Sequence, residues 1–343
     1  YEKASAALRD GICDFAVIGR GLIADPDMPN KLAEGRPEDI LPCISCNEGC
    51  IGSVLKGVHL RCALNPYAGF EDERKAPAAE TPKRVLVVGG GPGGCTAALL
   101  AKQAGHEVEL WERSGTIGGK TLAASAPYMK ADMLRLPNYY NVQLIKAGVP
   151  VRFFKEANRE TVAEFAPDVL IWAAGGDVVR PKSIPGLDRS NVYSCEEALR
   201  NYVPLGKHLA IIGGGQVGIE AAIHFNTVGH DVTVVEMADK LMPDPPFVQN
   251  ANVLKELMAA GTGTYLTGTK LVEVDAGGII VETAEGRRHI DCDTVLLAMG
   301  WSPDASRGEE LSDICRVIPV GDSSKCRNIL AATTEAYEAV ASI

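Results

Sequence analysis

Two stretches of the sequence repeat one pattern and decide the fold. The first, VLVVGGGPGGCTAALLAKQAGHEVELWER, runs from Val85 to Arg113, and the second, LAIIGGGQVGIEAAIHFNTVGHDVTVVEM, runs from Leu209 to Met237. Each reads as a continuous aliphatic strand, a glycine-rich turn, a helix and a second strand that ends at an acidic residue. Continuous apolar strands are typical of parallel sheets that are covered on both faces. The repeat therefore predicts an α/β fold built from two copies of one unit.

Each copy carries the residues with which a Rossmann-like unit binds a dinucleotide. The first glycine permits the tight turn, the second lets the backbone approach a pyrophosphate, and the third lets the helix pack closely on the strand. The helix N-terminus offers N–H groups to the phosphates, and the terminal acid accepts hydrogen bonds from ribose hydroxyls. These residues are Gly89, Gly91, Gly94 and Glu112 in the first copy, and Gly213, Gly215, Gly218 and Glu236 in the second. One glycine-rich turn alone is weak support, but agreement across both copies predicts two dinucleotide sites.

Composition excludes several classes of protein. The chain has 343 residues, a formal net charge of −10 and ten cysteines. The acidic charge argues against nucleic acid or an anionic membrane as the main partner, and no apolar run approaches the roughly 20 residues that span a bilayer. No signal peptide is visible, so we expect a cytoplasmic protein. The chain opens without Met on a helix-like segment, Tyr1 to Arg9, as if within a longer protein.

The segments after each copy suggest how the two units are connected. DVLIWAAGG, Asp168 to Gly176, and DTVLLAMGWSPD, Asp293 to Asp304, each read as a buried strand that ends in small residues. VIPVGDSSKCRNILAATTEAYEAV, Val317 to Val340, reads as a strand, a Gly-Asp turn and a helix. From about Lys83 onward this order resembles the two-dinucleotide-binding flavoproteins of the glutathione-reductase-like fold.

That resemblance implies an FAD-binding domain at residues 83–200 and 301–343, with an NADH-binding domain inserted at residues 201–300. Carried over by position, the FAD contacts would come from Gly89, Gly91, Gly94, Glu112, Gly118, Gly119 and Asp322. The NADH contacts would come from Gly213, Gly215, Gly218 and Glu236. Disulfide reductases of this fold carry a cysteine pair beside the flavin or in the NADPH domain, and neither copy here has one. Electrons must therefore leave the flavin by another route.

A four-cysteine loop precedes the first copy, within residues 41–82. The stretch LPCISCNEGCIGSVLKGVHLRCALNP places Cys43, Cys46, Cys50 and Cys62 in a Cys-x2-Cys-x3-Cys-x11-Cys pattern. Four thiolates suit a [4Fe–4S] cluster or a structural zinc ion. Zinc more often uses two separated Cys-x2-Cys pairs, and a flavin without a redox disulfide needs a one-electron partner, so the cluster is favoured. The remaining cysteines, Cys13, Cys95, Cys195, Cys292, Cys315 and Cys326, are expected to be small buried side chains.

The first 40 residues resemble the end of a TIM barrel. Asp10 to Arg36 reads as a helix end, a buried strand from Phe15 to Ile18, a Gly-Arg pair, a loop and a short helix. Gly19 and Arg20 would then lie at the C-terminal end of a barrel strand, where such folds bind phosphate groups. A surface turn is the plainer interpretation of an isolated Gly-Arg pair.

Taken in order, the barrel end, the cysteine loop and the two dinucleotide units resemble the NADH:flavin oxidoreductases of the 2,4-dienoyl-CoA reductase and 2-enoate reductase type, which are related to trimethylamine dehydrogenase. The resemblance implies an electron path from NADH through FAD and the [4Fe–4S] cluster to FMN, which would reduce an enoate or enoyl-CoA. Gly19 and Arg20 would hold the FMN phosphate. The rest of the barrel would be supplied by the same or another chain, and an oligomer is possible.

Two other functions compete with this one. A free-standing NADH diaphorase would hold flavin without a cluster, and a zinc-stapled nucleotide-binding sensor would have no turnover. The first dinucleotide site also leaves FAD and ADP open, because trimethylamine dehydrogenase keeps only ADP there. The substrate, the proton donor and the catalytic residues lie beyond what this sequence specifies.

Overall fold

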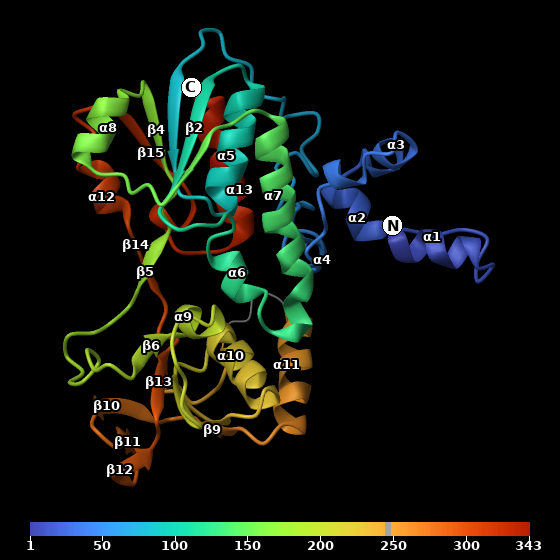
Figure 1. Ribbon diagram of the computed structural model, residues 1–343. Helices are drawn as coiled ribbons and strands as arrows, with labels where there is room; N and C mark the ends of the chain where they lie inside the picture. The colour runs from blue at the N-terminus through green and yellow to red at the C-terminus, as the bar shows by residue number, and fades with distance from the viewer. Residues whose placement is uncertain (244–247) are drawn as a thin grey trace.

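The computed structural model describes the backbone of residues 1–243 and 248–343, and the side chains of residues 1–243 and 250–343. Two separate parallel sheets organise these residues (Figure 1). The first has the order β15-β4-β1-β2-β3. Its strands are β1 (Arg84–Val88), β2 (Glu107–Glu112), β3 (Val151–Phe153), β4 (Val169–Trp172) and β15 (Arg316–Pro319). All of their pairings are parallel.

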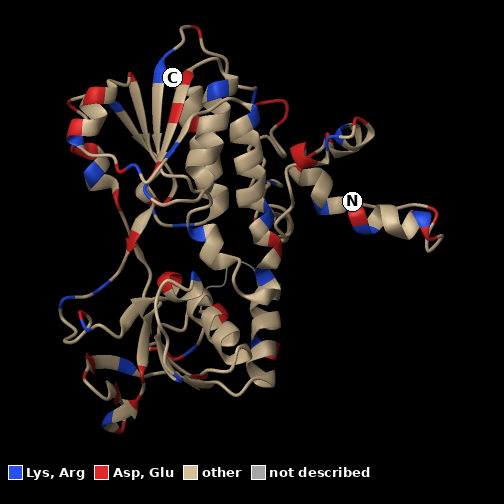
Figure 2. Ribbon diagram, viewed as in Figure 1, with Lys and Arg blue, Asp and Glu red and all other residues tan. Residues whose placement is uncertain are grey.

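Both faces of the first sheet are covered, which explains its unbroken apolar strands. Val85 and Val87 of β1 face a core that they share with α5 (Pro92–Gln103), α7 (Arg135–Lys146) and α13 (Ile329–Ala341). Leu86 and Val88 face a second core with α8 (Arg159–Phe165) and the segment after α12 (Ala305–Glu309). The central strand β1 has only Arg84 as a charged residue and β4 has none, whereas β2 carries Glu107, Glu109 and Glu112; Figure 2 colours the charged residues on the ribbon.

The second sheet, in the order β6-β13-β7-β8-β9, repeats this arrangement. Its strands are β6 (Val192–Ser194), β7 (His208–Ile212), β8 (Asp231–Val235), β9 (Thr264–Leu266) and β13 (Thr294–Leu297). One face packs on α9 (Cys195–Leu199), α10 (Gln216–Thr227) and α11 (Val248–Ala260). The other face packs on an antiparallel sheet of β10 (Lys270–Val274), β11 (Gly278–Thr283) and β12 (Gly286–Asp291).

The chain passes between the two sheets through a two-stranded antiparallel ribbon. Its strands are β5 (Gly176–Val178) and β14 (Trp301–Pro303). The second sheet is therefore built from residues that lie between β4 and β15 of the first sheet. Two short helical segments of the first fold, α6 (Lys120–Ala124) and η2 (Tyr128–Leu134), face the second fold (Figure 1). The predicted α/β class with parallel sheets is confirmed.

The N-terminal region forms short helices beside the first fold. They are α1 (Glu2–Arg9), α2 (Gly19–Ala24), α3 (Met28–Ala33), η1 (Pro37–Asp39) and α4 (Ile51–Leu55). The helix expected at Tyr1 to Arg9 is present and stands away from the sheets (Figure 1).

The buried strand expected from Phe15 to Ile18 is wrong for the described chain, because this segment has no regular secondary structure and pairs with no described strand. The side chains of Phe15 and Val17 are 84% and 96% exposed. Without a neighbouring strand there is no sheet into which they could be buried.

The isolated cysteines divide into two groups. Cys95, Cys195 and Cys292 are buried, as expected, whereas Cys13, Cys315 and Cys326 are only half-buried. No described helix is long and apolar enough to cross a membrane.

Candidate functional site

The first glycine-rich turn has no room for side chains at two of its three glycines. A Cβ atom on Gly89 would lie 2.2 Å from the Ala173 carbonyl oxygen, and one on Gly94 would lie 1.9 Å from the Gly89 carbonyl oxygen. Gly89 also has a φ of +104°, which favours glycine. At Gly91 a Cβ atom would meet only the Gly119 Cα atom, at 4.0 Å. The turn and the helix contact thus require Gly89 and Gly94, whereas Gly91 keeps the approach to the backbone open.

The second turn reproduces this geometry. A Cβ atom on Gly213 would lie 2.5 Å from the Ala298 carbonyl oxygen, and one on Gly218 would lie 2.0 Å from the Gly213 carbonyl oxygen. A Cβ atom on Gly215 would meet no described atom within 4 Å. In both folds the middle glycine therefore has no packing role, which suits a surface that a pyrophosphate approaches.

The two terminal acids are held in the same way. Glu112 accepts hydrogen bonds from the backbone N–H groups of Gly90 and Ser114, each at 2.7 Å. Glu236 accepts from the N–H groups of Gly214, at 2.6 Å, and Ala238, at 2.7 Å. Each carboxylate oxygen keeps a lone pair that is free for a further donor. The acids therefore fix the shape of the turns, and their contact with a ribose remains a prediction.

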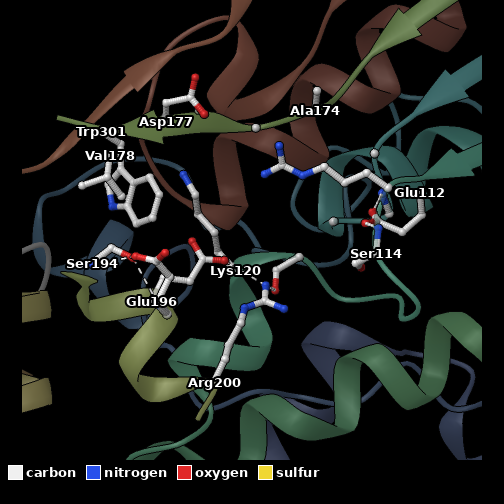
Figure 3. Close-up of a pocket in the computed structure, with 18 of the residues that line it drawn as sticks. Glu112, Ser114, Lys120, Ala174, Asp177, Val178, Ser194, Glu196, Arg200 and Trp301 are labelled. Atoms are coloured by element: carbon white, nitrogen blue, oxygen red, sulfur yellow. Dashed lines mark hydrogen bonds and ion pairs between the residues drawn. The ribbon is translucent and has the colours of Figure 1, made fainter. Parts of the chain in front are cut away.

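A cavity of about 570 Å³ opens beside the first turn (Figure 3). Glu112 and Ser114 lie at one end, Glu196 and Trp301 lie at the other, and Lys120 lies between them. Of the predicted FAD contacts, Gly89, Gly91, Glu112 and Gly119 line this cavity. Its size, and the glycine backbone along one wall, fit a dinucleotide.

The other three predicted FAD contacts, Gly94, Gly118 and Asp322, are not among the residues that line the cavity. Gly94 lies under the turn, and the N–H group of Gly118 donates to the Gly90 carbonyl oxygen at 2.8 Å. Asp322 forms an ion pair of 3.0 Å with Lys120. Lys120 in turn lies 3.5 Å from the ring centroid of Trp301.

Sequence reasoning missed several residues that line the cavity. They are Lys120, Arg180, Glu196, Glu197, Arg200, Tyr202 and Trp301. Lys120 directly follows Gly118 and Gly119, so its position in the sequence offered a signal. Arg180 lies in the connection into the second fold, the others from Glu196 to Tyr202 lie in or directly after its helix α9, and no motif marks any of them.

The four cysteines of the N-terminal loop line one small cavity, together with Arg20 and Asn47. A Cβ atom on Gly49 would lie 2.9 Å from the Arg61 carbonyl oxygen, so glycine lets the loop close against the segment that ends at Cys62. Burial raises the pKa of the Cys46 thiol to about 12 and also raises the pKa of Cys62. Metal binding at these thiols would therefore release protons.

A single-ion centre is not evident among the described residues, where no group of three or more His, Cys, Asp or Glu side chains is placed to hold one metal ion. The four cysteines nevertheless line one cavity. The identity of the bound group stays a prediction.

The cysteine loop is attached to the first fold at two elements. Ser45 donates a hydrogen bond of 3.0 Å to Asp132 of η2. Asn328, which caps α13, donates one of 2.6 Å to Glu48. Thr333 of α13 also donates to the Ala63 carbonyl oxygen, at 2.8 Å, from a fully buried position.

The two residues predicted to bind the FMN phosphate, Gly19 and Arg20, have different surroundings. Gly19 is exposed and begins α2, and a Cβ atom there would meet no described atom within 4 Å. Arg20 reaches back to the cysteine loop and donates a hydrogen bond to the Asn47 side chain. The contact of these two residues with FMN stays a prediction.

Flavin oxidoreductases and related reductases are similar to this chain in sequence and in fold. The NADH oxidase of Thermoanaerobacter brockii is 35% identical over 352 residues, which cover 98% of this chain and 53% of the relative. The cinnamate reductase of Clostridium sporogenes is 33% identical over 100% of this chain and 51% of the relative. A solved complex of 2-naphthoyl-CoA reductase with 2-naphthoyl-CoA matches with a TM-score of 0.95 at 32% identity, over 100% of this chain and 52% of that chain.

These relatives confirm the predicted resemblance to flavin oxidoreductases of the enoate reductase type, and the chain spans about half of their length. The sequence profile of one family, described as pyridine nucleotide-disulphide oxidoreductase, matches residues 83–313 and supports binding of FAD and NAD(H). Because that match takes in both glycine turns and the first strands of both sheets, the chain belongs to the pyridine nucleotide-disulphide oxidoreductase family.

Proposed function

We propose that this chain is the electron-input portion of an NADH-dependent flavin and iron–sulfur reductase of C=C bonds. One observation carries the proposal: the four-cysteine loop is held against η2 and α13, and both elements belong to the fold that contains the first dinucleotide cavity. A disulfide reductase would need a cysteine pair at that cavity, and none of the residues described as lining it is a cysteine. The cysteine loop is therefore the better acceptor of electrons from a flavin.

The residues of the chain take distinct parts in this function. Gly89 and Gly91 would admit the pyrophosphate of FAD, and Gly213 and Gly215 would admit that of NADH. The cluster ligands would be Cys43, Cys46, Cys50 and Cys62. When bound, these groups would supply hydride acceptance from NADH and one-electron transfer toward FMN.

The barrel remains part of the proposal. Phe15 and Val17 expose apolar side chains on a segment that pairs with no described strand, and burial of these side chains against another strand would favour pairing. The segment 1–40 would complete a barrel whose other strands come from the same or another chain, with Gly19 and Arg20 at the FMN phosphate. By analogy with the relatives, the substrate would be an enoate or an enoyl-CoA.

An absorption spectrum with iron and zinc analysis tests the cofactors. The protein, reconstituted without oxygen, is expected to bind flavin and about four irons, with a broad reducible absorption that Cys50→Ala removes while the flavin stays bound. Cys13→Ala, outside the loop, serves as the control and should keep its iron. Zinc in place of iron would favour a nucleotide sensor, and flavin without iron would favour a diaphorase. Chromatography of the released nucleotide separates FAD from ADP.

A pair of activity assays tests the electron path. NADH oxidation with ferricyanide should proceed in this chain, because it needs only the two dinucleotide folds. Reduction of cinnamate or of an enoyl-CoA should require the barrel as well. Enoate reduction by residues 1–343 alone would show that the active site has been misplaced, and a flavin-loaded sample that does not oxidise NADH would refute the whole scheme.

A further inference from the structure

Arg200 is attached to a helix of the second fold but reaches the cavity of the first. It follows directly after α9, whose residues Cys195, Ala198 and Leu199 lie in the core of the second fold. Its guanidinium donates a hydrogen bond of 2.5 Å to the Gly119 carbonyl oxygen, which belongs to the first fold. Arg200, labelled in Figure 3, and Gly119 both line the first dinucleotide cavity. The contact therefore joins the second fold to a wall of the first site.

The guanidinium of Arg200 is largely buried, and some of its N–H donors have no partner among the described residues. Its side chain is 11% exposed, and its one ion-pair partner among the described residues is Glu196, at 2.9 Å. The hydroxyl group of Tyr202 lies 3.4 Å from Nη1, at the long end of a hydrogen bond. The Nε atom is buried and has no partner among the described residues. A guanidinium carries five N–H donors, so at least two of them remain available.

The chemistry that best satisfies these donors is a phosphate anion. Guanidinium groups bind phosphate oxygens through paired, charge-assisted hydrogen bonds, and such bonds are strongest where water is excluded. The same cavity contains Gly91, where the open backbone suits a pyrophosphate, and Gly119 lies against it: a Cβ atom on Gly119 would be 3.0 Å from the Gly91 Cα atom. Arg200 thus adds a positive charge to the wall that the glycine turn forms.

We infer that Arg200 is a positioning residue for the pyrophosphate-bearing nucleotide of the first site, contributed by the inserted fold. It fixes the Gly119 loop and supplies positive charge to the anion, so that occupancy of the first site also fixes the second fold against the first. Glu196 holds the guanidinium when the site is empty and opposes the anion through its own charge. This inference rests on the proposed nucleotide site and adds a residue to it.

Ligands that differ in phosphate number test the inference. Binding of FAD, ADP and adenosine to the nucleotide-free protein is measured by calorimetry or flavin fluorescence. Arg200→Gln is expected to weaken FAD and ADP by about tenfold or more, because a charge-assisted hydrogen bond is lost. Adenosine, which has no phosphate, should change less than about twofold. Arg200→Lys should recover part of the loss, and Arg189→Gln, the same charge change at an exposed position, should change none of the three.

Glu196→Gln gives a prediction of opposite sign. Removal of its negative charge should tighten ADP by a few fold, because the acid no longer repels the anion. If Arg200 were merely structural, breaking its ion pair would instead weaken binding, and Arg200→Gln would weaken adenosine as much as ADP. Either result would overturn the inference. Wild-type protein that binds neither FAD nor ADP would instead refute the nucleotide site itself, and thermal melting shows whether each variant is folded.

Discussion

Lys130 of η2 and Glu220 of α10 form an ion pair of 2.7 Å that joins the first fold to the helix of the second glycine turn. The Glu220 side chain is 9% exposed and also accepts a hydrogen bond of 2.8 Å from Gln216. A buried carboxylate without its cation is costly. Lys130→Met should therefore lower the free energy of unfolding by about 1–3 kcal/mol, measured by urea denaturation.

Adding Glu220→Gln to that variant should recover most of the lost stability, because a neutral amide needs no cation and still pairs with Gln216. The two substitutions are thus expected to be strongly non-additive in a double-mutant cycle. Simple additivity of the two effects would mean that the pair contributes nothing to the contact between the folds.

Alanine at the middle glycines should separate binding from folding. Gly91 and Gly215 have φ values of −77° and −69°, which alanine adopts without strain, and a Cβ atom there meets little or nothing. Gly91→Ala should weaken FAD alone and Gly215→Ala should weaken NADH alone, each with a stability change within about 1 kcal/mol. Equilibrium binding and urea denaturation measure the two effects.

The matched controls are the third glycines of the two turns. Gly94→Ala and Gly218→Ala place a Cβ atom 1.9 and 2.0 Å from a backbone carbonyl oxygen. Because backbone cannot move aside, they should lose about 3 kcal/mol or more of stability. Normal folding of Gly94→Ala together with failed folding of Gly91→Ala would reverse the roles assigned to these residues.

The second fold is expected to prefer NADH to NADPH. Glu236 is held at the end of β8 by the N–H groups of Gly214 and Ala238, so its negative charge stays where the adenosine ribose would lie. A fixed carboxylate repels a 2′-phosphate by several kcal/mol. Glu236→Gln keeps a hydrogen-bond acceptor for the turn but removes the charge, and should reduce the kcat/KM preference for NADH by at least about tenfold.

Glu112→Gln is the corresponding change in the first fold and should leave that preference unaltered while it weakens FAD. Equal use of NADH and NADPH by the wild-type protein would exclude the assigned role of Glu236.

Stability should fall in mild acid because of His106. This ring is 3% exposed, and its Nδ1 atom accepts a hydrogen bond of 3.1 Å from the Lys83 N–H group. Burial, with a smaller effect from Lys83, lowers the pKa of His106 below its ordinary value of 6.5. Between the lowered pKa and 6.5 the unfolded chain binds the proton and the folded chain does not, so the free energy of unfolding decreases as the pH falls through this range.

Urea denaturation at about pH 7.5 and about pH 5.5 measures the effect, which His106→Gln should reduce. The matched variant is His230→Gln, at the corresponding residue of the second copy, whose Nδ1 atom donates a hydrogen bond of 2.8 Å to the Gly206 carbonyl oxygen. A pH dependence unchanged by His106→Gln would assign the acid sensitivity to other groups.

Local patterns were sufficient to predict the two glycine turns, their strands and the parallel sheets. The turns and strands depend on residues within one copy of the repeat: Gly94 meets Gly89, and the acid of each copy accepts a hydrogen bond from its own turn. The sequence could not indicate that Lys120 lies over Trp301 or that Arg200 reaches Gly119, because these residues are far apart in the sequence and meet only in the folded chain.

The expected strand at Phe15 failed for a related reason. Its apolar residues indicate a tendency to form a strand, but a strand also needs a partner with which to pair. The described chain provides none, and the segment stays unpaired with the side chains of Phe15 and Val17 in solvent.

The ribbon of β5 and β14 makes the second fold a removable module. Val178 pairs with Trp301 and Gly176 pairs with Pro303, so the chain leaves the first fold and returns to it at adjacent points. A two-residue hairpin turn between Val178 and Trp301 would close the first fold over a deletion of residues 179–300. The first fold would then lack Arg200, its proposed contact from the inserted fold, so the shortened protein offers a minimal scaffold onto which a different electron donor could be grafted.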